Sequence, residues 1–376
     1  MPVENNLAKG VLPSQAIEKM VAGGQIRART PIVADQIQPS SIDLRLDGEA
    51  FRVRASFLAS GAATIGSKLE QYRLHTIDLT RPAVLEKGCV YIVPLQEELA
   101  LPPHISGKAN PKSSTGRLDI FTRLITDEGR QFEIVPAGYQ GRLYAEVVPR
   151  TFSVVVRQGE RLSQLRLFQG NYAPSDELLR QLESEESLVY LPDETPGAAN
   201  IQNGLRLSVD LAGEGAGDGT DIIGYRARKH APLIDLARIQ HYDLDEFWDP
   251  IHRNDSRTLI LDPEDFYILA SRERVRIPAQ YAAEMVPFDA TIGEFRIHYA
   301  GFFDPGFGYG AGDINGTRAV LEVRSHEVPF IMEHGQVVAS LVFERLLERP
   351  RVLYGEGIGS SYQRQGLKLS KHFRSV

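Results

Sequence analysis

Short apolar runs bounded by turn residues recur along the whole chain. Examples cover residues 89–94, 142–148, 153–156 and 162–168, and Gly and Pro separate them. Runs of this length with many β-branched residues are typical of strands. Many short strands at such spacing favour a barrel or jelly roll. The pattern therefore predicts a mainly β protein.

Only two helices are predicted, and both are expected at the periphery. Ser14 can cap a helix that runs through Ala22, where two glycines follow. Ser175, followed by two acidic residues, can cap a second helix through about residue 184. Capping side chains at the start and glycines at the end are the usual signals of helix termini.

The pattern of apolar and polar positions repeats at a fixed offset. Tyr91 and Tyr267 lie in similar apolar runs, and 267 − 91 = 176. The same offset relates three further pairs, which are Glu146 with Glu322, Gly159 with Gly335, and Leu165 with Leu341. Apolar runs alone would not keep both a Glu and a Gly in register, so we interpret the repeat as a tandem duplication.

The two copies are placed at residues 1–205 and 206–376, called here the first and the second copy. The boundary lies near residues 212–220, which hold four glycines and few core-forming side chains. A length of 376 residues with 42% hydrophobic content suits two domains of ordinary size.

Charge and cysteine content narrow the range of functions. The net charge of −7 makes long nucleic acid an unexpected partner. No apolar run approaches a membrane span and no signal-peptide pattern opens the chain, so we expect a soluble, cytoplasmic protein without a membrane partner. The single cysteine, Cys89, excludes intrachain disulfides and every metal motif built on paired thiolates.

Residues 110–118, Asn-Pro-Lys-Ser-Ser-Thr-Gly-Arg-Leu, gather two cations, three hydroxyls and a glycine in one loop. Hydroxyls and backbone N–H groups bond phosphate oxygens, and Gly116 permits close approach. Arg117 can bind a phosphate with its planar fork, and Lys112 adds a point charge. On composition alone a solvated polar turn is the simpler interpretation, and a phosphate site is the alternative.

This loop resembles the phosphate loop of the dCTP deaminase and dUTPase superfamily, Arg/Lys-Ser-Ser-x-x-Arg-Leu, over Lys112 to Leu118. Residues 38–46, residues 137–141 with Glu146 eight residues after Gly138, and the tail from Tyr354 to Gly366 are similar to further segments of these proteins. The resemblance implies a dUTPase-like β-barrel or jelly roll of the β-clip type in each copy.

The resemblance also implies roles for individual residues. The phosphates would be held by Lys112, Ser113, Ser114, Gly116 and Arg117. The nucleotide would be covered by the tail residues Tyr354, Tyr362 and Gln365. The family's Asp-Pro-Gly motif is complete only in the second copy, where it contributes Asp304 and Gly306. Ser361 stands where the family has a tail lysine, for which Lys368 or Lys371 could substitute.

Glu146 and Glu322 occupy equivalent places on apolar strands, where a glutamate usually faces water. In the family a carboxylate at this place is the general base for water that attacks C4 of cytosine. Ser113 and Arg117 would orient that water. The sequence leaves open which glutamate serves.

The second copy lacks the cationic loop, because Phe288, Asp289, Ala290 and Gly293 replace its residues. We therefore expect one site per chain. It lies either between the first-copy loop and Glu322, or among first copies with Glu146.

The implied reaction is hydrolysis of dCTP to dUTP and ammonia, as in dUTP biosynthesis, by a homotrimer with Mg²⁺ on the triphosphate. Zinc is not expected, because zinc deaminases use His and paired Cys ligands and this chain has one Cys and no His-x-Glu motif. Two alternatives remain. One is a dUTP pyrophosphatase, alone or combined with deamination, and the other is a nucleotide-binding regulatory protein without catalysis.

Overall fold

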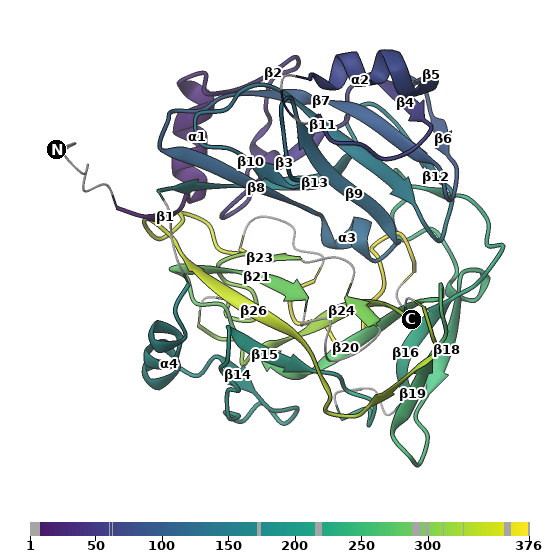
Figure 1. The fold of residues 1–376 in the computed structure, drawn as a ribbon. Coiled ribbons are helices and arrows are strands. Elements are labelled where there is room, and N and C mark those ends of the chain that lie inside the picture. The colour runs from purple at the N-terminus through teal and green to yellow at the C-terminus, as the bar shows by residue number, and fades with distance from the viewer. Residues whose placement is uncertain are drawn as a thin grey trace.

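The computed structural model describes residues 8–59, 61, 63–170, 174–214, 220–287, 295–297, 301–310, 312–325, 327–356 and 362–374. Over these ranges the chain is mainly β. The helices α1 (Ser14–Ala22), α2 (Ile65–Tyr72) and α4 (Asp176–Glu185) lie at the periphery, and the short helix α3 (Ser113–Gly116) lies between the two copies (Figure 1). The predicted fold class is therefore confirmed. No helix in these ranges is long and apolar enough to cross a membrane.

The first copy consists of two packed sheets. One has the order β1-β13-β8-β10 with β3 beside β13, and the other has the order β5-β4-β7-β11-β9 with β2 beside β7. Apolar side chains from both sheets, such as Leu44 and Leu165 on one and Tyr91 and Ala145 on the other, meet in a common core. The strands are β1 Gly10–Val11, β2 Ile26–Ala28, β3 Ile42–Arg45, β4 Glu49–Val53, β5 Arg73–Asp78, β7 Val90–Ala100, β8 Ile105–Pro111, β9 Ile120–Thr126, β10 Ile134–Val135, β11 Gln140–Pro149 and β13 Arg161–Gln169.

The second copy repeats this arrangement. Its sheets have the orders β15-β26-β21-β23 and β18-β16-β20-β24-β22, with β14 beside β20. The strands are β14 Val189–Tyr190, β15 Leu205–Ser208, β16 Ile222–Ala227, β18 Trp248–His252, β20 Phe266–Val275, β21 Tyr281–Pro287, β22 Phe295–Ile297, β23 Phe302–Phe303, β24 Thr317–Ser325 and β26 Val337–Arg345. Two small sheets complete the fold, formed by β6 Ala83–Leu85, β12 Val154–Val156 and β17 Ile234–Asp235, and by β19 Thr258–Leu261 with β25 Phe330–Glu333.

Strand registers support the duplication at the level of single residues. Glu146 lies opposite Ile92 in the pair β11 and β7, and Glu322 lies opposite Ile268 in the pair β24 and β20. Both the strand order and the partner of each glutamate are thus repeated at the 176-residue offset.

Both predicted helices are present, with one correction at a cap. α1 spans Ser14–Ala22, but its cap is Pro13, whose extended backbone leads into the helix, and Ser14 is already helical and buried. α4 spans Asp176–Glu185, and the Ser175 hydroxyl caps it by accepting a hydrogen bond from the Leu178 N–H at 3.4 Å. Two short α-helices were not predicted, α2 Ile65–Tyr72 and α3 Ser113–Gly116, and neither were the 3₁₀ helices η1 Ala34–Gln36 and η2 Leu244–Glu246.

The segment between the copies packs with the second one. Leu179 and Leu182 of α4, and Leu205 of β15, belong to the core of the second copy. The boundary after residue 205 stays a prediction about where the duplicated sequences join. Residues 215–219 of the glycine-rich segment lie outside the described ranges.

The two copies pack directly against each other, and α3 of the first copy lies on the side that faces the second (Figure 1). Apolar second-copy side chains such as Trp248 and Phe266 belong to the core cluster of the first copy, and buried polar pairs also join the two. Arg166 on β13 is fully buried and reaches into the second copy, where it donates to the Ala283 carbonyl at 3.1 Å and to Glu344 at 2.7 Å. Arg324 on β24 pairs with Asp119, which follows α3. These contacts fix the first-copy loop against the strand of the second copy that carries Glu322.

Candidate active site

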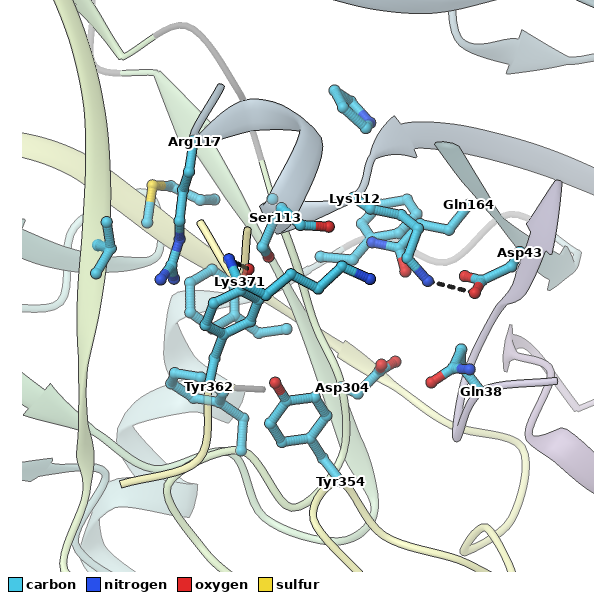
Figure 2. Close-up of a pocket in the computed structure, with 18 of the residues that line it drawn as sticks. Gln38, Asp43, Lys112, Ser113, Arg117, Gln164, Asp304, Tyr354, Tyr362 and Lys371 are labelled. Carbon is cyan, nitrogen blue, oxygen red and sulfur yellow. Dashed lines mark hydrogen bonds and ion pairs between the residues drawn. The ribbon is translucent and has the colours of Figure 1, made fainter. Parts of the chain in front are cut away.

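A cavity of about 380 Å³ lies where the first copy, the second copy and the C-terminal tail meet (Figure 2). Nine of the residues predicted from the sequence line it, which are Lys112, Ser113, Ser114, Arg117, Asp304, Glu322, Tyr354, Tyr362 and Gln365. Glu146, Gly116 and Gly306 do not line it. One chain thus supplies a loop from one copy and a carboxylate from the other.

Arg117 follows α3 and is held by the tail. Its Nη1 donates to the Lys368 carbonyl at 2.8 Å and its Nη2 donates to the Gln365 side chain at 3.0 Å. Its guanidinium carbon lies 3.9 Å from the centre of the Tyr362 ring, a cation–π arrangement. Nε is buried and has no hydrogen-bond partner among the described residues. Nε of Arg117 therefore remains available to donate a hydrogen bond to a bound molecule.

Glu322 on β24 is the carboxylate nearest to that donor. Its Oε1 lies 4.0 Å from Nε of Arg117, and both side chains are almost fully buried. Burial raises the pKa of Glu322 to about 7, against the opposing charge of Arg117. A carboxyl group with a pKa near neutrality can both accept and return a proton at physiological pH.

Glu146 lies in a different environment. It is fully buried, and its Oε1 accepts from Nη2 of Arg123 at 2.5 Å on the neighbouring strand β9. The Arg123 guanidinium in turn lies over the Phe132 ring. Near Tyr144 on the same strand, side chains of α2 such as Ile65 form a small core cluster. Glu146 occupies in the first copy the position that Glu322 occupies in the second. Its carboxylate is therefore ion-paired and buried within the first copy.

Asp304 enters the cavity from the loop after β23. Its Oδ1 accepts a hydrogen bond from Ser40 at 2.5 Å, and Arg166 Nη2 lies 3.8 Å away. Burial raises the pKa of the Asp304 carboxyl, although the charge of Arg166 opposes this. Ser40 belongs to the first copy, so Asp304 is also oriented across the interface.

The tail crosses both copies. Gln365 accepts from Arg117 and donates to the Arg318 carbonyl of β24 at 3.1 Å, so one amide joins the loop to the strand of Glu322. Farther along, the Ser370 hydroxyl donates to the Ser114 carbonyl at 2.9 Å. Burial raises the pKa of the Tyr362 hydroxyl, which therefore stays protonated.

The two glycines predicted to belong to the site, Gly116 and Gly306, do not line the cavity. Their place in the fold is in the backbone that supports it. Gly306 has φ of +97°, and a Cβ there would lie 2.8 Å from Cβ of Leu353 and 2.9 Å from N of Tyr354. Its lack of a side chain lets the tail approach the Asp-Pro-Gly loop. Gly116 lies within α3, one residue before Arg117.

One end of the cavity is strongly charged, and sequence analysis identified only part of it. Lys112 pairs with Asp43 (Figure 2). Arg161 Nη2 donates a hydrogen bond to Asp35 at 3.0 Å. Lys371 also lines this end, whereas Lys368 does not. Burial and the nearby charge of Lys112 lower the pKa of Lys371. Asp35 and Arg161 were not predicted, and Asp43 was noted only as part of the motif that ends Asp-x-Arg-Leu.

Within the described ranges no three His, Cys, Asp or Glu side chains are gathered so that they could hold a metal ion. Cys89 is partly buried and packs against the first core. Of the second-copy positions that replace the cationic loop, residues 288–290 and 293 lie outside the described ranges.

Comparison with known proteins agrees with this organisation. Residues 8–171 match the family model of the N-terminal domain of 2′-deoxycytidine 5′-triphosphate deaminase, and residues 175–373 match the model of its C-terminal domain. A crystal structure of 2′-deoxycytidine 5′-triphosphate deaminase from Agrobacterium tumefaciens is similar with a TM-score of 0.85 and 49% sequence identity. The match covers 92% of this chain and 100% of that chain.

Shorter relatives match less than half of this chain. A protein named "dCTP deaminase, dUMP-forming" from Corynebacterium glutamicum (strain R) is 29% identical over 163 residues, which are 42% of this chain and 80% of the relative. One with the same name from Corynebacterium diphtheriae is 32% identical over 142 residues, which are 37% of this chain and 71% of the relative.

Proposed function

This chain belongs to the 2′-deoxycytidine 5′-triphosphate deaminase family, and we propose that it hydrolyses dCTP to dUTP and ammonia in the cavity between its two copies. The observation that carries the proposal is the pair formed by Glu322 and Arg117. It combines a buried carboxyl of near-neutral pKa with a guanidinium donor that has no partner among the described residues, in a cavity that also holds cations and hydroxyl groups.

Glu322 acts as the general base in this proposal. A distance of 4.0 Å is too long for a direct hydrogen bond, and a water molecule can bond both Glu322 and Nε of Arg117. Ser113 supplies a hydroxyl on the same side of the cavity. The carboxylate removes a proton from this water as its oxygen bonds to C4 of cytosine, and the proton passes to N3.

The second half of the reaction uses the same carboxyl. Glu322 takes the remaining proton from the new hydroxyl on C4 and gives it to the amino group. The C4–N4 bond breaks, ammonia leaves, and C4 keeps the oxygen as a carbonyl. Water has then supplied the oxygen and both protons, and Glu322 returns to its ionised form.

The charged end of the cavity receives the triphosphate. Lys112, Arg161 and Lys371 offer cations, and the hydroxyls of Ser113 and Ser114 add neutral donors. Gly116 lets the loop approach closely. At the other end Asp304, supported by Gly306, and the tail residues Tyr354, Tyr362 and Gln365 enclose the nucleoside.

Mg²⁺ is proposed to accompany the substrate. A triphosphate supplies the hard oxygen ligands that this ion prefers, so no dedicated cage of protein side chains is required. Bound there, the ion would neutralise part of the phosphate charge. Zinc independence rests on the ligands that the sequence provides, a single cysteine and no His-x-Glu motif.

A second candidate is a reaction that continues to dUMP and pyrophosphate. The names of the shorter relatives favour it. Chromatography of the products separates the two, because deamination alone yields ammonia and dUTP in equal amounts while the combined reaction yields dUMP. Failure to release ammonia from dCTP would exclude both.

We also propose that three chains associate, as the resemblance to the dCTP deaminase and dUTPase superfamily implies. The cavity is lined by residues of both copies of this chain. Light scattering tests the assembly, and a species near 41.8 kDa at assay concentrations would exclude an obligate trimer.

A further inference from the structure

The charged end of the cavity contains a buried carboxylate to which the deamination mechanism assigns no task. Asp43 lies on β3 opposite Gln164 of β13, and only 2% of its side chain is exposed. Its Oδ2 pairs with the Lys112 ammonium (Figure 2). The same oxygen lies 3.8 Å from Nη1 of Arg161. Its Oδ1 is buried and has no hydrogen-bond partner among the described residues.

The groups around Asp43 are those expected around a phosphate. Lys112 precedes α3, Arg161 begins β13, and Lys371 belongs to the tail, so three separate segments each direct a cation toward the same end of the cavity. The acidic groups in this region are Asp35, which binds Arg161, Asp304, whose charge is felt at a longer range, and Glu160, whose charge acts on Lys371. No other carboxylate described here pairs with Lys112.

We propose that Asp43 takes the place of a phosphate at Lys112, and that a triphosphate displaces it while Asp43 takes up a proton. This inference rests on the proposed function, because it assumes that the triphosphate binds at this end. Lys112 cannot serve Asp43 and a phosphate oxygen equally well. Once the lysine turns to the phosphate, an ionised Asp43 would remain buried beside new negative charge.

Protonation resolves that conflict. Burial already raises the pKa of the Asp43 carboxyl, with Lys112 and Arg161 acting in the opposite direction. Loss of these cations to the ligand raises this pKa further, so a proton binds together with the phosphates. Between the pKa values of the free and bound states, affinity therefore falls as the pH rises.

The simplest alternative is that Lys112 and Asp43 form a permanent structural pair. Arg161, Lys371 and the loop hydroxyls would then bind the phosphates alone. In that case removal of the Asp43 charge would loosen the loop and weaken binding, which is the opposite of the result expected here.

Calorimetric titration with magnesium tripolyphosphate tests the proposal without turnover, because this probe carries the phosphates and no base. Titrations near pH 7 in buffers of different ionisation enthalpy count the protons taken up. The wild-type protein should take up more protons than Asp43→Asn, and the variant should bind about tenfold more tightly because a like charge has been removed. Equal proton uptake, weaker binding by Asp43→Asn, or no binding of the probe to the wild type would overturn the proposal.

Asp35→Asn is the matched control. It removes a carboxylate from the same end of the cavity, but 70% of that side chain is exposed, so its proton uptake should match the wild type. Lys112→Gln provides a second variant if Asp43→Asn does not fold. Without Lys112, Asp43 is protonated beforehand, and proton uptake should again fall.

The outcome separates this inference from the deaminase proposal. Normal deamination with unchanged proton uptake in Asp43→Asn would defeat only the role of Asp43. Coupled binding of tripolyphosphate by a protein that releases no ammonia from dCTP would defeat only the reaction.

Discussion

Arg117 and Glu322 come from different copies of the duplicated domain, yet Nε of the first lies 4.0 Å from Oε1 of the second. The equivalent glutamate of the first copy, Glu146, has its own arginine on the adjacent strand and no part in the cavity. The two copies have thus become different, one presenting the loop and the other the carboxylate.

Exchange of Glu322 for glutamine should affect catalysis, whereas exchange of Glu146 should affect stability. Glu322→Gln should lower kcat for dCTP by about 10²-fold or more, because the amide cannot accept a proton from water. Glu146→Gln should leave kcat nearly unchanged and lower stability by about 2 kcal/mol, because it weakens a buried charged hydrogen bond to Arg123. Steady-state kinetics and thermal unfolding of both variants provide the measurement. An active Glu322→Gln enzyme beside an inactive Glu146→Gln enzyme would place the reaction among first copies instead.

The rate should depend on pH through Glu322. Its pKa is raised to about 7, and only the ionised form can accept a proton from water. In Asp43→Asn, which has no Asp43 proton to take up with the phosphates, kcat/KM should therefore rise with pH through about 7 and level off above it, since this parameter reports groups of the free enzyme. In the wild type the fall in affinity with pH that we propose for Asp43 opposes this rise. A flat profile from pH 6 to 8 in Asp43→Asn would argue against Glu322.

Arg117→Ala should impair both binding and chemistry. It removes a guanidinium that is fixed by Gln365, the Lys368 carbonyl and the Tyr362 ring, and it removes the positive charge beside Glu322. KM should increase, kcat should fall, and the pKa seen in kcat/KM should move above its wild-type value because Arg117 lowers the pKa of Glu322. Arg117→Lys restores the charge but not the planar fork, so it should recover the pKa more than the rate. Unaltered kinetics in Arg117→Ala would remove this loop from the site.

Much of the site could be predicted because it depends on local residue types. Lys112 to Arg117 form a contiguous loop, and the glutamates stand out as charges within apolar strands. The choice between Glu146 and Glu322 could not be made, because it depends on which faces of the two copies meet. Asp43 and Arg161 were not singled out for the same reason. Each is an ordinary charge in its own segment and acquires a role only through neighbours far away in the sequence.

The same distinction applies to the fold. Long runs such as those of β7 and β11 are visible from periodicity, whereas α2 has only Ile65 and Leu69 as buried positions over two turns. Its packing against the sheet of the first copy is a tertiary effect. The raised pKa of Glu322 is likewise a consequence of burial that no pattern of residues reveals.

Chelators test the two proposals about metal ions, that catalysis needs no zinc and that the substrate binds together with Mg²⁺. Deamination should survive a zinc-selective chelator, because one cysteine and no His-x-Glu motif leave the chain without the usual ligands of a catalytic zinc site. Removal of Mg²⁺ should raise KM for dCTP, because the triphosphate would then bind with its full charge. Activity that is lost with the zinc chelator and restored by zinc would refute this prediction.

Gly306→Ala should weaken nucleotide binding by displacing the tail. The new Cβ would stand 2.8 Å from Cβ of Leu353 and 2.9 Å from N of Tyr354, so the tail must move away from the loop that carries Asp304. Gly312→Ala is the matched control, since that glycine has nearly the same φ, +98° compared with +97°, but a Cβ added there would meet no atom of the described residues within 4 Å. Both variants carry the same backbone strain, and only Gly306→Ala adds the collision. KM for dCTP should therefore increase in Gly306→Ala well beyond any change in Gly312→Ala, and protease cleavage of residues 362–374 should become faster. Equal kinetics in the two variants would mean that close packing of the tail on this loop does not contribute to binding.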